Sequence, residues 1–266
     1  MTGVSSKNDS SLLLRNQQDG VTTLTLNRPK ARNALSLGLM SDLRQALRDI
    51  ETDTSTRVVV IAANGPAFCA GHDLKEIRAN PGRRAYETLF GQCSDLMLAI
   101  TQLPKPVICR VHGMATAAGC QLVATCDLAV AAQEAMFATP GVNIGLFCST
   151  PMVAVSRNVP RKQTMEMLLT GEPISAATAC QYGLVNRVVS ADRLDAEVDK
   201  LSRTIVEKSP LTLAMGKEAY YRQLELGLSD AYAYTSEVMT RNMLARDAQE
   251  GIDAFIAKRE PSWEGR

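Results

Sequence analysis

Residues 111–147 read VHGMATAAGCQLVATCDLAVAAQEAMFATPGVNIGLF, and this stretch decides the fold. Apolar runs, a turn and a helical pattern alternate along it, which is typical of a chain that passes back and forth between a sheet and the helices that cover it. The predicted elements are a strand over 106–111, a tight turn at His112-Gly113, a buried helix through Leu122 and Val123, a strand around 128–130, and a loop opened by Pro140-Gly141.

Small side chains gather where the predicted helix begins, at Ala115, Thr116, Ala117, Ala118 and Gly119. They allow a helix to pack closely on its neighbours, and they leave its first backbone N–H groups accessible. Free N–H groups at a helix N-terminus attract negative charge as it develops, which is what an oxyanion hole requires. Close helix packing alone is the alternative explanation for the same residues.

A second stretch, Gly65 to Ile77, reads GPAFCAGHDLKEI and follows the apolar run 58–61. Together the two stretches resemble the enoyl-CoA hydratase/isomerase, or crotonase, superfamily, over nearly the whole chain. The resemblance implies an α/β fold with a crotonase-like ββα spiral core and a C-terminal helical trimerisation region. It also implies that the backbone N–H groups of His72 and Ala118 form an oxyanion hole.

The two positions that carry a catalytic glutamate in hydratases of this family hold other residues here, Gln121 and Gly141. An amide can only form hydrogen bonds, and glycine has no side chain, so neither residue is a general base. The chain therefore resembles a divergent member, of the enoyl-CoA hydratase domain-containing type, that keeps the acyl-CoA pocket and lacks both carboxylates. Gln121 is left to orient a water molecule or the substrate.

The CoA-binding residues are inferred from the same resemblance. The set comprises Lys30, Ala31, Arg32, Ala70, Gly71, Asp73, Lys75, Phe255 and Lys258. Arg32 stands where the family often has leucine, and Lys30 and Arg32 can equally be a solvated pair. Asp73 can instead cap the following helix. Lys258 can be a charge that complements the end of the last helix.

Ser149 is also a candidate catalytic residue, because it stands eight residues past Gly141, where several crotonase branches place an aspartate. A serine nucleophile needs a base beside it, and none is adjacent in the sequence. The alternative is that Ser149 or Thr150 caps a helix that begins at Pro151. The His72 imidazole is a weaker acid–base candidate, since the resemblance gives the role to its backbone N–H.

Composition limits the classes of protein that fit. The chain has 266 residues, a net charge of +1 and 21% charged residues, which gives no case for nucleic acid or anionic membrane as a partner. Seven dispersed cysteines without a C-x-x-C pair favour a reducing compartment and argue against a disulfide framework or a metal site. The first eleven residues lack an apolar stretch and include Asp9, so we expect no targeting signal and a cytoplasmic protein.

The rest of the sequence predicts a hairpin and several helices, and it divides the chain into three parts. A disordered lead over 1–10, a ββα core over 11–200 and a helical region over 201–266 are expected. The main elements are a hairpin around Asp19-Gly20, a helix over 37–50 capped by Ser36, a buried strand over 58–61, a helix over 84–103, and four C-terminal helices at 194–208, 211–226, 229–242 and 246–258.

Three functions stay open on the sequence. The first is an acyl-CoA-binding lyase of the enoyl-CoA hydratase/isomerase type in fatty acid or acyl-CoA metabolism, which stabilises a thioester enolate and needs no cofactor beyond the CoA of its substrate. The second is a non-catalytic acyl-CoA-binding homologue. The third is thioester hydrolysis through Ser149 or Cys148. The resemblance further implies a homotrimer or a dimer of trimers, and it leaves the acyl length open.

Overall fold

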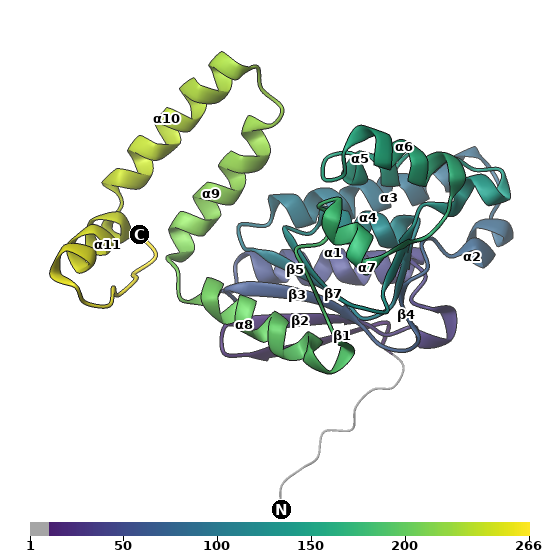
Figure 1. Cartoon of the computed structure of the whole chain (residues 1–266), viewed down its shortest axis with the longest axis horizontal. Helices are drawn as coiled ribbons and strands as arrows, with labels where there is room; N and C mark the ends of the chain where they lie inside the picture. Colours follow the sequence, from purple (N-terminus) through teal and green to yellow (C-terminus); the bar gives the residue numbers. More distant parts are fainter. Residues whose placement is uncertain (1–10) are drawn as a thin grey trace, which may run out of the picture.

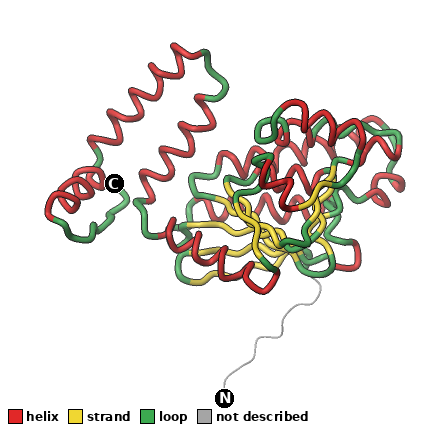
Figure 2. The backbone as a smooth tube through the Cα atoms, in the orientation of Figure 1, coloured by secondary structure: helices red, strands yellow, loops and turns green. Residues whose placement is uncertain are grey.

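The computed structural model of the protein describes residues 11–266, and the predicted lead over 1–10 lies outside them. Two β-sheets and the helices around them form the core, and three helices at the C-terminal end extend from it as an arm (Figure 1). The backbone tube shows the strands gathered in the middle of the core with helices on both sides (Figure 2). The α/β class predicted from the sequence is confirmed.

The larger sheet has six strands in the order β1-β2-β3-β5-β7-β10. Its first two strands form the predicted hairpin, and every other neighbouring pair is parallel. Asp19 and Gly20 form the hairpin turn with φ of 50° and 80°. The strands are β1 (Leu13–Gln18), β2 (Val21–Leu26), β3 (Val58–Ala63), β5 (Val107–Val111), β7 (Leu128–Ala132) and β10 (Arg187–Val189).

The smaller sheet has four very short strands in the order β4-β6-β8-β9. They are β4 (Ala67–Cys69), β6 (Met114–Thr116), β8 (Met136–Ala138) and β9 (Ile174–Ser175). The sequence did not reveal this sheet, because strands of two or three residues are too short to display a period of two. It matters for function, since β4 and β6 each lead directly into a segment of the predicted site.

Helices cover both faces of the larger sheet. Alternate residues of β3 divide between two cores: Val59 and Ile61 pack with the helices α1, α3 and α4, while Val58 and Val60 pack with α8. This alternation explains why β3 is apolar throughout. Elements outside the arm are η1 (Pro29–Ala31), α1 (Leu37–Glu51), α2 (Leu74–Ala79), α3 (Arg83–Gln102), α4 (Ala118–Thr125), η2 (Pro140–Ile144), α5 (Pro151–Val155), α6 (Arg161–Thr170), α7 (Ala176–Gln181), η3 (Ala191–Arg193) and α8 (Leu194–Val206).

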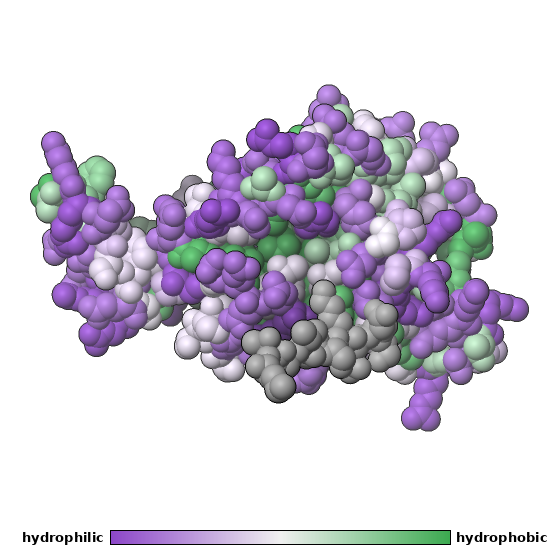
Figure 3. Space-filling view, turned by 90° about the horizontal axis from the view of Figure 1, so that it is seen from below, coloured by the Kyte–Doolittle hydropathy of each residue, from purple (hydrophilic) through white to green (hydrophobic). Residues whose placement is uncertain are grey.

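The arm consists of α9 (Pro210–Gln223), α10 (Leu228–Leu244) and α11 (Arg246–Ala257). α10 and α11 pack mainly on α9 and on each other. Large apolar side chains remain exposed along the arm, including Leu228, Leu244 and Phe255. The space-filling view shows hydrophobic surface at the end of the molecule that the arm forms, at left (Figure 3). The domain boundary expected at residue 200 falls inside α8, which packs on the sheet.

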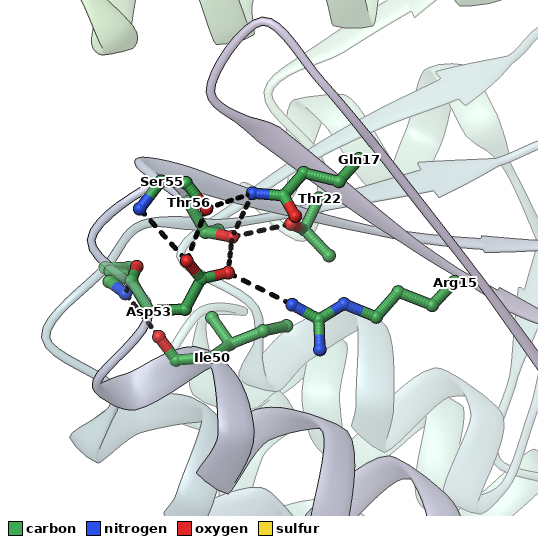
Figure 4. A network of polar contacts seen from close by, with 8 residues as sticks. Arg15, Gln17, Thr22, Ile50, Asp53, Ser55 and Thr56 are labelled. Carbon is green, nitrogen blue, oxygen red and sulfur yellow. Dashed lines mark hydrogen bonds and ion pairs between the residues drawn. The ribbon is translucent and has the colours of Figure 1, made fainter.

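A polar network fastens the hairpin to the loop between α1 and β3 (Figure 4). The Asp53 carboxylate forms an ion pair with Arg15 at 3.1 Å and accepts a hydrogen bond from the Thr56 hydroxyl at 2.8 Å. Thr56 in turn contacts Thr22 on β2, with 2.7 Å between the hydroxyl oxygens. Hydrogen bonds from Ser55 and Thr56 hold the pKa of Asp53 at about 2, so the network is built around an ionised carboxylate.

Candidate active site

The backbone around His72 forms a parallel bridge with Leu35. Leu35 donates its N–H to the Gly71 carbonyl at 2.7 Å and accepts the Asp73 N–H at 3.2 Å. Leu35 thus bonds the residues on either side of His72, and the N–H of His72 itself points the other way. Within residues 11–266 this N–H donates to no backbone carbonyl.

Ala118 is the first residue of α4, and its N–H belongs to the helix turn that has no partner inside the helix. The preceding residue, Ala117, has φ 50° and ψ −118°, a conformation that side chains rarely adopt and that costs about 1–3 kcal/mol. Ala117 is held there by its own N–H bond to the Ala138 carbonyl at 2.9 Å. The Ala118 N–H, like that of His72, has no backbone acceptor in the described chain.

Gly71 brings these two segments together. It has φ +87°, and a β-carbon placed on it would lie 3.4 Å from the Ala118 nitrogen and 3.0 Å from the Thr116 carbonyl oxygen. A side chain at position 71 would therefore enter the space beside the start of α4. The two unpaired N–H groups belong to segments in direct contact, which is the arrangement that a two-donor oxyanion hole requires.

Gln121 lies on α4 and is almost fully buried, with 4% of its surface exposed. Its Oε1 accepts from the Cys93 thiol at 3.8 Å. The side chain lines a cavity of about 670 Å³ between α3, α4, α5 and α9. His72 and Ala118 are not among the residues that line this cavity.

Gly141, where the resemblance implies a glutamate, is closed over by its own loop. A β-carbon on it would lie 2.7 Å from the Leu146 carbonyl oxygen and 3.0 Å from the Cys148 sulfur. The loop is fixed in this position by a hydrogen bond from the Leu146 N–H to the Gly141 carbonyl at 2.9 Å. The structure therefore has no space for a longer side chain at this position, and backbone occupies the place next to it.

Ser149 and Cys148 show no activated nucleophile. The Ser149 hydroxyl donates to the Phe147 carbonyl at 3.4 Å, and burial raises the pKa of the Cys148 thiol. The helix expected to begin at Pro151 does begin there. The expected side-chain cap is wrong, because Thr150 is the N-cap residue and forms no capping bond: it has helical dihedrals, which turn the hydroxyl away from the N–H groups of the first turn.

The His72 imidazole is a neutral ring in an apolar setting. Burial lowers its pKa to about 4, and it packs edge-on against Phe90 with 5.6 Å between ring centroids. Its Nε2 is enclosed without a hydrogen-bond partner among residues 11–266. At neutral pH this side chain carries no charge next to the backbone N–H that is the predicted donor.

The loop that was expected to bind CoA is tied down by polar residues that the sequence analysis did not single out. Lys30 and Ala31 lie in η1, and the Arg32 carbonyl accepts the Ala70 N–H at 3.0 Å, which joins the loop to the His72 segment. The Asn33 side chain donates to the carbonyls of Asn64 and Ala67 and accepts the Arg28 N–H. Arg28 precedes Pro29 and Asn33 follows the turn that begins there, and polar residues around a proline turn were the signal available in the sequence.

Both carboxylate oxygens of Asp73 are used in contacts that stabilise the fold. It accepts from the N–H groups of Lys75 and Glu76 at 3.1 and 3.3 Å, so it caps α2, which was the alternative reading of this residue. Its other oxygen pairs with Arg28 at 2.9 Å. The Asp73 side chain therefore fastens the loop before η1 to the helix that follows His72.

In a single copy of the chain, Phe255 and Lys258 lie far from the His72 segment. Phe255 is on α11 and 85% exposed, and Lys258 follows the helix with φ 53°. α11 is at the opposite end of the molecule from α2, which follows His72 directly (Figure 1). One copy of the chain does not bring the C-terminal pair to the predicted site.

Metal-binding clusters and membrane-spanning helices are both absent from residues 11–266. No group of three or more His, Cys, Asp and Glu side chains is arranged to hold a metal ion. Among the helices of the same residues, none combines the length and apolarity needed to cross a bilayer.

Solved structures share this fold closely. A structure described as enoyl-CoA hydratase from Mycobacterium smegmatis is 55% identical, with a TM-score of 0.94 over 96% of this chain and 99% of that one. A structure of human enoyl Coenzyme A hydratase domain-containing protein 3 is 46% identical, with a TM-score of 0.93 over 95% of this chain and all of the other. These neighbours confirm a crotonase-like fold.

The curated relatives correct the expected localisation. The proteins from Rattus norvegicus and Xenopus laevis named "Enoyl-CoA hydratase domain-containing protein 3, mitochondrial" are 47% and 48% identical, over 93% and 95% of this chain and 82% and 86% of their own lengths. Their names point to mitochondria, so the expectation of a cytoplasmic protein is wrong. It rested on a few N-terminal residues and on cysteine usage, and a reducing environment does not separate one intracellular compartment from another.

A family model described as "Enoyl-CoA hydratase/isomerase" matches residues 16–266, which includes both segments of the site and the arm. The relatives at 46–48% identity are of the enoyl-CoA hydratase domain-containing type, as the two motifs indicated. The chain belongs to the enoyl-CoA hydratase/isomerase, or crotonase, family.

Proposed function

We propose that this protein binds an acyl-CoA thioester and stabilises its enolate through the backbone N–H groups of His72 and Ala118. The observation that carries the proposal is that both groups lack a backbone acceptor within residues 11–266 while Gly71 holds their segments in contact. Donors fixed in this way act on negative charge without having to reorganise. Loss of one such donor typically costs about 3–4 kcal/mol of transition-state stabilisation.

The reaction class is that of a hydratase/isomerase-type lyase, and its rate is limited by the missing carboxylates. Gln121 cannot exchange a proton near neutral pH, and Gly141 has backbone packed against it where a glutamate would project. Binding and carbonyl polarisation therefore remain, while addition of water to an enoyl thioester lacks its general acid and base. A non-catalytic acyl-CoA-binding protein is the second candidate, favoured by this closed position.

The rest of the predicted site follows from the same proposal. The CoA moiety lies along the segments that contain Lys30, Ala31, Arg32, Ala70, Gly71 and Lys75. Phe255 and Lys258 close over CoA from a neighbouring subunit of a homotrimer or of a dimer of trimers, because one chain leaves them exposed on the arm. In the part of the chain that the structure describes, the Ser149 hydroxyl is bonded to the Phe147 carbonyl and not to a base, so thioester hydrolysis has no observation in its favour.

The experiment pairs binding with carbonyl polarisation. Butyryl-CoA is titrated into the full chain by calorimetry, and infrared difference spectra are recorded with a ¹³C-labelled thioester carbonyl. We expect binding together with a shift of the carbonyl stretch to lower wavenumber, since two hydrogen bonds weaken the C=O bond. Binding without a shift contradicts the oxyanion hole, and absence of binding contradicts the acyl-CoA site itself.

Turnover is followed in the same preparation as loss of crotonyl-CoA absorbance. Slow or absent hydration agrees with the missing carboxylates. Rapid hydration that survives a Gln121→Ala substitution would show that another residue supplies the acid and base.

A further inference from the structure

A cavity of about 280 Å³ lies between α8 and the larger sheet, on the opposite face of the sheet from α3 and α4 (Figure 1). Its floor is formed by the neighbouring strands β2, β3 and β5, and its wall by the first half of α8. None of His72, Ala118 and Gln121 lines it. The cavity is therefore separate from the acyl-CoA site, and its volume is close to the lower end of the range for small-molecule sites.

The cavity exists because β3 carries alanine where it passes the start of α8. Val60 belongs to the core beneath α8, and Ala62, the next residue on the same face, fills less space. Thr25 on β2 pairs with Ala62. The register of β3 with β5 continues from Ile61↔Cys109, which sets Arg110 on the other side of Ala62. A hollow is thus left between a hydroxyl side chain and a guanidinium.

Arg110 offers part of its guanidinium to this hollow. Its Nε donates to the Asp195 carboxylate on α8, whereas its two terminal nitrogens donate to no group among residues 11–266. These nitrogens are not enclosed by protein atoms. A guanidinium with free terminal N–H groups is the side chain best suited to hold a carboxylate by paired hydrogen bonds.

Asp199 provides the opposite charge. It stands four residues after Asp195, so both carboxylates lie on one face of α8, about 5–6 Å apart between their β-carbons. Asp195 is bonded to Arg110, whereas Asp199 has no cationic partner in the part of the chain that the structure describes. Both aspartates line the cavity. One position for a negative group and one for a positive group are therefore available, about one helical turn apart.

This pair of charges disfavours simpler ligands. A plain carboxylate or phosphate would bind next to two aspartates, and a plain amine would bind next to a guanidinium, so each would meet a like charge without compensation. The rest of the wall includes three valines, Val21, Val60 and Val198. A small molecule that carries both charges and a short aliphatic group matches all of these features.

We propose that this cavity binds a free aliphatic α-amino acid, with its carboxylate on Arg110, its ammonium group on Asp199 and its side chain against the valines. Each hydrogen bond spans about 3 Å, so two charged groups carried by one carbon atom reach both protein partners. The hydroxyls of Thr23 and Thr25 line the same cavity and provide further acceptors for the ammonium group. This site goes beyond the proposed function, since it shares no residue with the predicted acyl-CoA site.

The test uses L-valine as the probe, titrated into the full chain by calorimetry. Two analogues each lack one charge: isovalerate has no ammonium group, and L-valinamide, which also represents the N-terminal residue of a peptide, has no carboxylate. Each analogue loses a charge-assisted hydrogen bond, so each should bind at least about tenfold more weakly than L-valine. In NMR spectra of protein with ¹³C-labelled alanine methyl groups, L-valine should shift the Ala62 signal.

Three variants locate the site. Arg110→Gln and Asp199→Asn should each weaken L-valine binding at least about tenfold, and Ala62→Leu, which fills the hollow without a change of charge, should abolish it. Asp42→Asn, at an exposed carboxylate on α1, is the matched control for Asp199→Asn and should keep the full affinity. Thermal unfolding of each variant verifies that it is folded.

Absence of L-valine binding to the unaltered chain would overturn the proposal. An affinity for either analogue equal to that for L-valine, or full binding of L-valine in folded Arg110→Gln, would overturn it as well. None of these results bears on the oxyanion hole, because butyryl-CoA binding is measured separately and should be the same in all of these variants.

Discussion

A β-carbon on Gly119 would lie 2.8 Å from the β-carbon of Cys69 and would overlap the Cys69 carbonyl oxygen. α4 is thus seated directly on the backbone of β4, with no side chain between them. Because β4 leads to His72 and α4 begins at Ala118, this contact sets the distance between the two predicted oxyanion donors.

Substituting Gly119 by alanine should force α4 away from β4. We expect the free energy of unfolding to fall by about 1–3 kcal/mol, the usual cost of inserting a methyl group into a close-packed contact. Affinity for butyryl-CoA should fall with it, since the two N–H groups separate. The control is Gly216→Ala in the exposed part of α9, where nothing lies within 4 Å of the new methyl group. That substitution should stabilise by about 1 kcal/mol through helix propensity, and urea unfolding measures both.

Placing a glutamate at the two positions where the resemblance implies one should have opposite effects on stability. Gly141→Glu places a side chain against the Leu146 carbonyl and the Cys148 sulfur, so the free energy of unfolding should fall by about 2 kcal/mol or more. Gln121→Glu keeps the size of the side chain and should fold normally. Gly91→Glu, on the exposed face of α3 with nothing near its β-carbon, is the control and should unfold no more easily than the unaltered chain. Thermal unfolding of the three variants distinguishes these cases.

His72 should make stability depend on pH between about 4 and 6.5. Burial lowers its pKa to about 4 in the folded chain, while the unfolded chain binds the proton near 6.5. The unfolded state therefore holds more protons in this window, and the free energy of unfolding must rise with pH across it. The full contribution, up to about 3 kcal/mol, is present above pH 6.5 and is lost as the pH falls through 4. Urea titrations at several pH values should show a shallower slope for His72→Asn, and an unchanged slope would contradict the buried neutral ring.

Asp53 should make stability depend on pH in a lower range than His72 does. Hydrogen bonds from Ser55 and Thr56 hold its pKa at about 2, against 3.8 for an ordinary aspartate. Its stabilising effect is present above pH 3.8 and is lost as the pH falls through 2. An Asp53→Asn variant should therefore lose less stability than the unaltered chain between pH 4 and 2. Equal losses in the two proteins would show that the network in Figure 4 does not depend on the charge.

Among the arm residues, Lys217 should cause the largest loss of stability when it is substituted. Its buried ammonium donates to Asp127 at 2.7 Å and to the carbonyls of Ile100 and Lys105, both at 2.9 Å. Lys217→Met leaves the Asp127 carboxylate without its cation and should cost about 3–5 kcal/mol in urea unfolding. Lys200→Met, at an exposed position on α8, should change stability by less than about 0.5 kcal/mol. The double variant Asp127→Asn/Lys217→Met should recover part of the loss, because it removes the unpaired charge.

The sequence predicted the strands and helices that have a clear period or a clear stop signal. Ser36 caps α1 by accepting the Leu39 N–H, and the turn at Asp19-Gly20 forms the hairpin. The second sheet escaped prediction because its strands are held by neighbours distant in the chain and not by their own pattern. Thr150 shows the same limit, since the residue type suits a cap but the backbone around it does not.

Of the candidate site, the sequence indicated the two backbone N–H donors but not how the side chains around them are packed. His72 and Ala118 could be chosen from two short motifs, and neither N–H group donates to a backbone carbonyl among residues 11–266. The closed space at Gly141 depends on the path of residues 142–148 and could not be read from a glycine alone. The contact between the Cys93 thiol and the Gln121 amide oxygen joins residues 28 positions apart, and the sequence did not reveal it.

α10 and α11 pack on α9 and not on the sheet, so the arm and the core differ in local stability. The amide protons of these two helices can exchange with solvent deuterium whenever the arm opens, without disruption of β3, β5 or β7. Their protection factors report the free energy of that local opening, while those of the central strands report global unfolding. In a single copy of the chain the arm is therefore the region where deuterium enters first.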